Sequence, residues 1–381
     1  MPIIDHCRAE AILSKILAKT TVTCERIGDN IPYTPLNGRY SAESEKDLAW
    51  WCNGFFAGML WQLYHASKDE IFRKKAENIE RRLDETFHDF VGLHHDVGFM
   101  WLHTAVANYR LTGNEQSKKR GLHAASILAG RYDPEAYFIN AWNHHRGWTI
   151  IDTMMNLPLL HWAAQIDRQP HYKYIAMEHA ITANEILVRH DGSVAHLAVM
   201  DRKTGKASEY PAGQGYASGS SWTRGTAWAI YGYALSHLHG NDAASDHHLK
   251  DGEFLGYAKQ LAHYFIANVA QTGWIAPIDF RQPAEPEVFD TTAGLIAACG
   301  LLEIAKHVDE HEKALYINAA HNIIASTETK WADWSHNSDG IIGGGSESYG
   351  NPNTHHVPII YGDYFFTEAI LRILGKEFLI W

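Results

Sequence analysis

The sequence predicts an all-α protein built as an α/α toroid, a closed ring of six antiparallel helix pairs. Apolar residues recur at spacings of three and four along most of the 381 residues, which gives each helix one apolar face. Short polar turns separate these segments, so successive helices form hairpins. The hairpins return at intervals of about 50 to 60 residues without a shared short motif, which favours a closed ring over a stacked solenoid.

Twelve helices make up most of the predicted structure. They cover residues 5–27, 45–66, 69–88, 97–112, 115–131, 148–166, 171–189, 222–240, 250–270, 289–307, 309–330 and 361–376. The second helix shows the pattern, because Cys52, Phe55, Met59 and Leu63 lie on one face. No stretch has the composition of a linker, so residues 1–381 are expected to form a single domain.

Longer irregular stretches between the hairpins are expected to gather at one end of the ring and to build the functional site. They are residues 28–44, 133–147, 191–221, 271–288 and 331–360. Within them, the alternating stretch 192–210 predicts a small β-hairpin with its turn at 201–205. The Gly-rich stretch 343–356 lacks the Lys-Ser/Thr ending of a phosphate-binding loop and is predicted to be a mobile lid.

Composition and charge favour a carbohydrate ligand. The chain has 13 Trp, 18 Tyr and 25 His, and aromatic faces stack on sugar rings while His and carboxylates bind hydroxyl groups. The excess of 44 acidic over 33 basic residues gives a formal charge of −11, which repels the phosphates of nucleic acid.

The four cysteines form no CxxC pair, and Cys52 and Cys299 lie in apolar helical patterns, so no disulfide framework is expected. The first residues lack the order of a secretory signal, and no apolar run reaches the ~20 residues of a membrane span. We therefore expect a cytoplasmic protein that binds neither nucleic acid nor membrane.

Asp96 follows His94 and His95 in the stretch GLHHDVGFMW and precedes an apolar helical run. A carboxylate at the start of a helix commonly accepts hydrogen bonds from main-chain N–H groups, so Asp96 taken alone is expected to be a helix cap. The neighbouring histidines and aromatic residues favour a second interpretation, in which Asp96 is one of two catalytic acids. Both interpretations remain open at this point.

Asp152 lies in RGWTIIDTMMNLPLLHWAA, the most apolar stretch of the chain. A carboxylate in such surroundings must be paired, protonated or turned toward a cavity. Burial favours the protonated form of a carboxyl group, which is the form that a general acid needs. Asp152 is therefore either a general acid or a core residue hydrogen-bonded by Asn156, one turn later.

The stretch GQGYASGSSWTRGTAW, residues 213–228, has several glycines just before a predicted helix. Glycines give the main chain conformational freedom there. Trp222, Arg224 and Trp228 follow in that helix. An arginine between two tryptophans can bind a carboxylate with two hydrogen bonds while an indole stacks on a sugar ring. The alternative is an arginine that pairs with an Asp or Glu of the protein.

Metal binding and a serine nucleophile are both disfavoured. The pairs His94/His95, His144/His145 and His355/His356 are adjacent in sequence, and neighbouring side chains point apart in regular structure. Neither HExxH nor GxSxG occurs. We expect no metal and no other cofactor.

Eight segments, taken together and in order, resemble the unsaturated glucuronyl hydrolases of glycoside hydrolase family 88. They are WWCNGFFAGMLW, LHHDVGFMW, FINAWN, IIDTMMNLPLLHWA, DGSVAHLAVMDRKTG, GQGYASGSSWTRGTAWAIYGYAL, DTTAGLIAACGLLEI and YGDYFFTEAILRI, which span about residue 45 to the C-terminus. The resemblance implies an (α/α)6 barrel enzyme, with one catalytic domain over residues 1–381. It also implies removal of a 4,5-unsaturated uronic acid from the non-reducing end of oligosaccharides made by polysaccharide lyases.

The resemblance also implies roles for individual residues. Asp152 matches the general acid and base of the family, and Asp96 matches its partner acid. The positions that match the binding site for the unsaturated sugar are His196, Gln214, Trp222, Arg224 and Trp228, and those at its rim or walls are Trp51, Asn53, His95 and Trp142. The expected chemistry is protonation at C4 followed by addition of water at C5.

Three other functions remain as alternative hypotheses. The unsaturated rhamnogalacturonyl hydrolases share the barrel and an acid like Asp152, but the HHD motif that contains Asp96 favours the glucuronyl group. A sugar epimerase or isomerase on the same fold would use paired His bases and would not need Asp152. A carbohydrate-binding protein without activity would keep the aromatic cavity alone.

Overall fold

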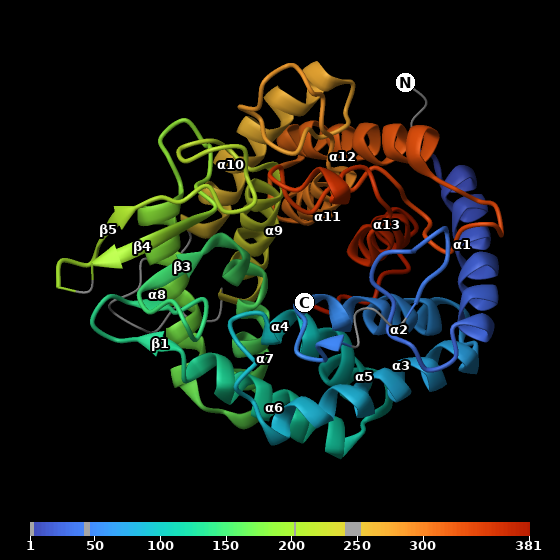
Figure 1. Cartoon of the computed structure of the whole chain (residues 1–381), viewed down its shortest axis with the longest axis horizontal. Helices are drawn as coiled ribbons and strands as arrows, with labels where there is room; N and C mark the ends of the chain where they lie inside the picture. Colours follow the sequence, from blue (N-terminus) through green and yellow to red (C-terminus); the bar gives the residue numbers. More distant parts are fainter. Residues whose placement is uncertain (1–3, 42–45, 202, 241–252) are drawn as a thin grey trace.

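The computed structural model describes residues 4–41, 46–201, 203–240 and 253–381, and it confirms the ring of helix pairs (Figure 1). The inner ring consists of α2 (Phe55–Ser67), α4 (Val97–Trp101) continued by α5 (Ala107–Thr112), α7 (Leu157–Asp167), α9 (Thr223–Gly240), α11 (Thr291–His307) and α13 (Ile360–Ile373). The outer ring consists of α1 (His6–Arg26), α3 (Glu70–Leu83), α6 (Glu115–Ala129), α8 (Pro170–Leu187), α10 (Glu253–Val269) and α12 (Glu310–Trp331). Each inner helix packs against an outer helix that is its neighbour in sequence, except α13, which packs against α1.

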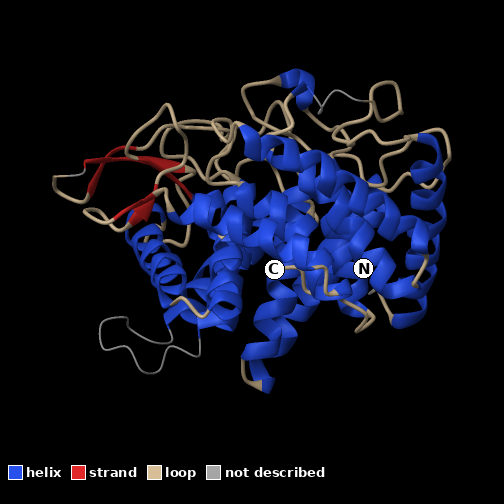
Figure 2. Cartoon of the chain, turned by 90° about the horizontal axis from the view of Figure 1, so that it is seen from below, coloured by secondary structure: helices blue, strands red, loops and turns tan. Residues whose placement is uncertain are grey.

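Connection lengths place the long described loops, which lead from outer to inner helices, at one end of the ring. The chain passes from an inner to an outer helix through two residues at 68–69, 113–114, 168–169 and 308–309. It returns from outer to inner helices through the long stretches that precede α2, α4, α7, α9, α11 and α13. These stretches gather at the end drawn uppermost in Figure 2, so the inner helices all begin there, as expected for the functional end.

Two small antiparallel sheets belong to these loops. One pairs β1 (Tyr132–Asp133) with β2 (Phe138–Ile139). The other has the order β3 (Trp148–Ile150), β4 (Leu197–Asp201) and β5 (Lys206–Glu209), and its β4–β5 hairpin was predicted.

The predicted start of a helix at residue 148 is wrong, because Trp148–Ile150 form strand β3. Trp148 and Ile150 pair with Val199 and Leu197 of β4, and aromatic and β-branched residues suit a strand. The chain becomes helical only at Ile151, in a 3₁₀ turn (Ile151–Met155) that leads to α7. The contact with β4 is tertiary, so local periodicity did not reveal it.

Other helix boundaries also differ from the prediction. The predicted helix 97–112 contains a π-helical turn (Leu102–Val106), and the predicted helix 45–66 starts with a 3₁₀ turn (Trp51–Gly54). Residue 45, residues 250–252 of the predicted helix 250–270, and residue 202 of the predicted hairpin turn lie outside the described residues.

The core lies between the two rings and inside the inner ring. Trp381 reaches this interior and stacks on Phe365, with ring centroids 5.9 Å apart, while its indole N–H donates to Glu368. All four cysteines are free thiols, and Cys52 and Cys299 are buried as predicted. Within the described ranges, every helix is too short or too polar to span a lipid bilayer.

Candidate active site

The two predicted acids lie at the end of the ring where the loops gather. Asp96 immediately precedes α4, and Asp152 lies in the 3₁₀ turn before α7. Both are therefore near the N-terminal ends of inner helices, where the helix dipole is positive. This end of a net acidic protein consequently offers a favourable field to an anionic ligand.

Asp96 occupies the N-cap position of α4 but does not cap the helix. The cap is Asn156, whose Oδ1 accepts from the main-chain N–H of Phe99 at 2.8 Å. The Asn156 amide donates to Asp96 Oδ1 and to the main-chain oxygen of Asp152, both at 3.2 Å. A Cβ at Gly98 would lie 2.6 Å from Asn156 Oδ1, so only glycine permits this approach. The capping interpretation of Asp96 is thus wrong, and its carboxylate is available to the site.

The carboxylate of Asp96 contacts both preceding histidines. His95 Nε2 lies 3.1 Å from Oδ1, and His94 Nδ1 lies 3.5 Å from Oδ2. Burial alone would raise the pKa of Asp96, but His95 and His94 outweigh it and hold the pKa below its ordinary value. Burial likewise opposes charge on His95, yet Asp96 raises the pKa of that ring. Burial lowers the pKa of His94 to about 4.

Asp152 is buried without a hydrogen bond to its inner oxygen. The residue is 9% exposed, and Oδ2 lies 3.5 Å from His196 Nε2. Among the described residues, neither Oδ2 nor Nε2 has a hydrogen-bond partner. Asn156 meets only the main chain of Asp152, so the interpretation of Asp152 as a core acid bound by Asn156 is wrong. Leaving a buried polar atom unpaired costs about 1–3 kcal/mol, and such atoms are typical of functional sites.

His196 is fixed by the loop that precedes α9. Its Nδ1 accepts from the main-chain N–H of Gln214 at 2.9 Å, and its ring lies against Trp222 with centroids 4.0 Å apart. Gly213 has φ +59°, and a Cβ there would lie 2.0 Å from His196 Nδ1. Glycine is therefore required next to this ring for both space and conformation.

His95 is fixed by the loop that precedes β3. Its Nδ1 lies 2.7 Å from the main-chain oxygen of Ala141, which also accepts from Arg131 at 3.3 Å. Trp142 packs edge-on against the His95 ring, with centroids 5.6 Å apart. Each acid therefore faces a histidine whose far nitrogen is bound by the main chain.

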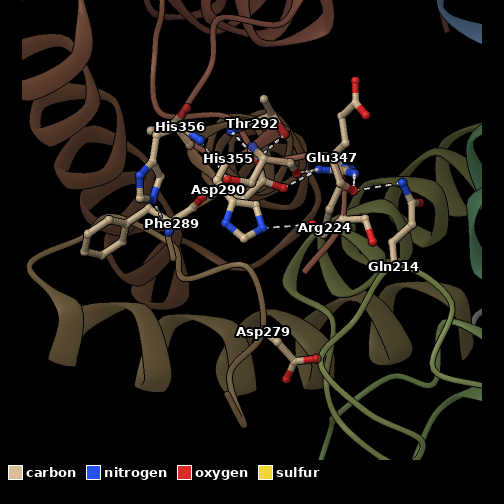
Figure 3. A network of polar contacts seen from close by, with 12 residues as sticks. Gln214, Arg224, Asp279, Phe289, Asp290, Thr292, Glu347, His355 and His356 are labelled. Atoms are coloured by element: carbon tan, nitrogen blue, oxygen red, sulfur yellow. Dashed lines mark hydrogen bonds and ion pairs between the residues drawn. The ribbon is translucent and has the colours of Figure 1, made fainter. Parts of the chain in front are cut away.

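Arg224 binds protein groups, which is the alternative that the sequence left open. Its guanidinium pairs with Asp290 and donates to the main-chain oxygens of Ser346 and Glu347 at 2.8 and 2.7 Å. Gln214 also donates to the Glu347 oxygen, at 2.8 Å. Figure 3 shows both side chains pointing toward Glu347.

These contacts anchor the Gly-rich stretch 343–356. In addition to the bonds from Arg224 and Gln214, Tyr33 donates to the Glu347 carboxylate, and Ser346 donates to the main-chain oxygen of Phe289 at 2.6 Å. The stretch predicted to be a mobile lid is thus bound to several other segments of the chain.

The remaining predicted site residues are half-buried or buried. Trp51 is half-buried against Phe99 and Tyr361. Asn53 is buried and donates to the main-chain oxygens of residues 47 and 48. Trp228 is 0% exposed and packs on Phe99, so it is a core residue. Their roles toward a ligand stay predictions.

One group of side chains in the described part of the chain has the composition of a metal site. The ligand atoms of His94, His95 and Asp96 lie within 4.8 Å of one another. Only one ring nitrogen of His95 is available, because the other is bound to Ala141. The expectation that no metal is needed stays a prediction.

Sequence reasoning missed several residues that build the site. Asn156 was expected to bind the Asp152 side chain, but instead it connects both acids. Asp290 and Glu347 were missed; the only signal for Asp290 was its position before an apolar helical run. The Ala141 oxygen and the Gln214 N–H belong to the main chain and leave no signal in residue type.

Comparison with known proteins gives consistent matches over most of the chain. The family model of Glycosyl Hydrolase Family 88 matches residues 33–268. The unsaturated glucuronyl hydrolase of Bacillus sp. (strain GL1) is 33% identical over 368 residues, 94% of each chain. Its crystal structure superposes with a TM-score of 0.86 over 96% of this chain and 95% of the other. The unsaturated chondroitin disaccharide hydrolase of Streptococcus pneumoniae is 30% identical over 348 residues, 87% of this chain and 83% of its own.

Proposed function

The chain belongs to glycosyl hydrolase family 88, and we propose that Asp152 and Asp96 carry out its reaction. It is a glycoside hydrolase that releases an unsaturated uronic acid from oligosaccharides. The observation that supports this choice of acids is the Asn156 amide, which connects Asp96 to the main chain of Asp152 where the loops gather.

The substrate itself suggests the chemistry. A 4,5-unsaturated uronic acid is an enol ether, so a proton added at C4 produces an oxocarbenium ion at C5. Water then adds to C5 and gives a hemiketal. The hemiketal opens to a ketone at C5, and the resulting hemiacetal at C1 releases the next sugar. This route differs from that of ordinary glycosidases, which place the oxocarbenium character at C1 and use two carboxylates across the bond.

Asp152 gives the proton to C4 and then takes a proton from the attacking water, so the reaction returns it to its starting state. Its buried carboxyl group, in the turn before α7 at the end of the ring where the loops gather, supports this role. Asp96 binds hydroxyl groups of the unsaturated ring and holds its charge against His95. Trp142 and Trp51 are half-buried and offer aromatic surfaces of the kind that sugars pack on, whereas Trp222 is buried between His196 and Arg224.

Arg224 and Gln214 matched family positions near the substrate carboxylate. In the free protein both donate to the Glu347 main-chain oxygen. For either side chain to bind the substrate carboxylate directly, that carboxylate must replace the Glu347 oxygen. We propose that Arg224 acts first by fixing the stretch 343–356 at the entrance to the cavity.

The alternative enzyme classes make different demands on the same residues. An epimerase with two His bases needs both rings free to exchange protons, whereas His95 and His196 each have one nitrogen bound to the main chain. An unsaturated rhamnogalacturonyl hydrolase would lack the HHD motif that contains Asp96. We further propose that the enzyme acts in the cytoplasm, since its four free thiols suit a reducing compartment.

The test is to incubate the purified protein with a panel of lyase-generated disaccharides and to follow the ultraviolet absorbance of the C4–C5 double bond. Absorbance should fall with at least one unsaturated glucuronyl substrate and should not fall with the Asp152→Asn variant. Activity that persists in this variant, or absence of activity across the panel with the wild-type protein, would refute the proposal.

A further inference from the structure

Each acid of the site faces one nitrogen of a histidine ring, while the other nitrogen of that ring is bound by the main chain. The main-chain group is an N–H for His196 and a carbonyl for His95. An N–H can only donate and a carbonyl can only accept. The two rings are therefore held in different protonation states.

For His196, the Gln214 N–H donates to Nδ1 at 2.9 Å. Nδ1 must supply a lone pair, so the proton of the neutral ring lies on Nε2. Nε2 is the nitrogen that lies 3.5 Å from Asp152 Oδ2. A second proton could enter the ring only at Nδ1, and it would break the bond to Gln214. His196 thus carries its proton on the nitrogen nearest Asp152, although Nε2 and Oδ2 form no hydrogen bond in the free protein.

For His95, the Ala141 oxygen lies 2.7 Å from Nδ1 and accepts its proton. Nε2 then lies 3.1 Å from Asp96 Oδ1, with the ring 1% exposed, although the two atoms are not aligned for a hydrogen bond. A bare Nε2 and an ionised carboxylate would place two lone pairs in contact in a buried site. A further proton on the pair removes this repulsion, and the raised pKa of His95 beside the lowered pKa of Asp96 agrees with it.

We propose that the main chain assigns opposite proton roles to the two histidines. Through the Gln214 amide, His196 is held neutral with its proton on Nε2, the nitrogen nearest Asp152. Through the Ala141 carbonyl, His95 keeps Nδ1 protonated and shares a further proton with Asp96. Both histidines act as positioning residues. This inference deepens the proposed function, on which its chemical meaning rests.

The assignment identifies the reacting oxygen of Asp152. Oδ2 is buried against His196, so Oδ1 is left to meet the substrate and carry the proton for C4. His196 cannot take that proton while Gln214 occupies its Nδ1. The proton can then leave Asp152 only toward the cavity, which favours transfer to substrate over loss to a neighbouring base.

The charged and titratable groups around the His95 ring come from several elements. Asp96, His94 and Asp152 surround His95, and His179 and Arg131 interact with it or with Asp96 through their charges. Burial holds the pKa of His94 near 4 and that of His179 near 3, so both are neutral near pH 7. The extra proton on this side of the site consequently belongs to the His95–Asp96 pair.

The tautomers can be read directly by long-range ¹H–¹⁵N spectra of the full-length protein labelled with ¹⁵N-histidine, without substrate. Two core histidines serve as internal references. His103 Nδ1 lies 2.7 Å from the Phe99 oxygen and must be protonated, and His179 Nδ1 accepts from the Ile139 N–H at 3.0 Å and must be bare. The variants His95→Asn and His196→Gln assign the site signals by their loss.

We expect His196 to show the pattern of His179, with the proton on Nε2 only. We expect His95 to have a protonated Nδ1, as in His103, and an Nε2 signal shifted toward the protonated form. A protonated Nδ1 in His196, or a bare Nδ1 in His95, would overturn the proposal. Because these spectra concern the resting protein, they remain informative even if no substrate in the panel is cleaved.

Kinetics separate this role from simple packing. Glutamine places an amide near the position of Nε2 and asparagine places one near Nδ1, so His196→Gln should retain about tenfold more kcat than His196→Asn. His95→Asn keeps a donor for Ala141 but removes the group that faces Asp96. It should raise the acidic limb of the kcat/KM profile by about one pH unit. Equal kcat of the two His196 variants, or an unchanged profile for His95→Asn, would contradict the proposal.

Discussion

Two buried polar networks lie in the inner ring, and they differ in how completely they are paired. Toward the C-terminal ends of α11 and α13, Arg372 donates to Glu303 at 2.7 Å and to Glu368 at 2.9 Å. Tyr231 and the Trp381 indole also donate to Glu368. The partners of Glu303, chiefly His307 and Arg372, outweigh burial and hold its pKa well below the ordinary range.

At the opposite end of the ring, the hydrogen-bond network around Asp152 is incomplete. Asp152 Oδ2, His196 Nε2 and the Trp222 indole nitrogen are buried, and none has a hydrogen-bond partner in the described part of the chain. The closed network satisfies its charges with protein groups and so contributes to one well-defined fold. The open network keeps polar atoms unpaired at a cost in stability, as expected where a ligand supplies the missing partners.

The largest effect is expected from Asp152→Asn, which tests whether the incompletely paired network serves catalysis. We expect kcat to fall by about 10³-fold, in the range that positioned acid–base groups contribute. The thermal unfolding midpoint should stay unchanged or rise, because the variant removes a poorly paired buried carboxylate. Steady-state kinetics and calorimetry measure the two effects. A large loss of stability would show that Asp152 belongs to the structural network instead.

Arg372→Met tests the fully paired network, where we expect a loss of stability and little change in activity. Removing one member of a buried ion pair leaves Glu303 and Glu368 uncompensated, so the free energy of unfolding should fall by about 3 kcal/mol. Denaturant unfolding measures it, and kcat per folded molecule should change little. The control is Lys313→Ala, which removes an exposed pair with Glu310 and should cost less than about 1 kcal/mol.

Asp96→Asn tests the charge coupling between Asp96 and His95 at the same end of the ring as Asp152. We expect kcat/KM to fall by about 100-fold, since a positioned acid and its charge are lost. Asp96 is also what raises the pKa of His95 against the effect of burial, so in the variant that pKa should drop below its ordinary value. The wild-type pair stays ionised between the lowered pKa of Asp96 and the raised pKa of His95. A histidine titration by NMR that leaves His95 unchanged would contradict this coupling.

A smaller effect is expected from Gly213→Ala, which touches no charge. The added Cβ would lie 2.0 Å from His196 Nδ1 and must displace the ring, so kcat should fall about tenfold, as for the loss of one hydrogen bond. Gly219 gives a matched control, because it has a φ of +76° in the same loop and nothing within 4 Å of an added Cβ. Gly219→Ala should share the backbone strain but keep the activity.

The smallest effect concerns the metal-like group His94, His95 and Asp96. Because one nitrogen of His95 is bound to Ala141 and the residues are adjacent in sequence, we expect no dependence on a metal. Prolonged dialysis against a chelator should leave kcat/KM within about twofold of its starting value, well under 1 kcal/mol. Loss of activity that added Zn²⁺ restores would reverse this prediction.

Most of the fold could be predicted because helix formation here follows local periodicity. The twelve predicted helices correspond to observed helical segments, since each amphipathic face is encoded within its own residues. Strand β3 was missed because Trp148 and Ile150 become a strand only through pairing with β4, almost 50 residues later. Tertiary contacts of this kind override local pattern.

The site could be predicted only in part, for a related reason. Asp152 stood out because carboxylates are rare in such apolar surroundings, and Asp96 stood out because histidines and aromatic residues lie next to it. Their mutual position depends on the ring, and the bridge between them is Asn156, which the sequence connected only to Asp152. The partners of Arg224 were also out of reach, because Asp290 and Glu347 are far from it in sequence and meet it only in the closed barrel.

The close approaches at Gly98 and Gly213 have a practical consequence for protein engineering. A designer who transfers this site to another helical barrel will naturally copy the acids, the histidines and the tryptophans. The graft would still fail if either glycine were replaced, because the Asn156 bridge and the His196 ring occupy the space that any side chain would fill. The minimal set of residues to transfer therefore includes Gly98 and Gly213, which contribute by having no side chain.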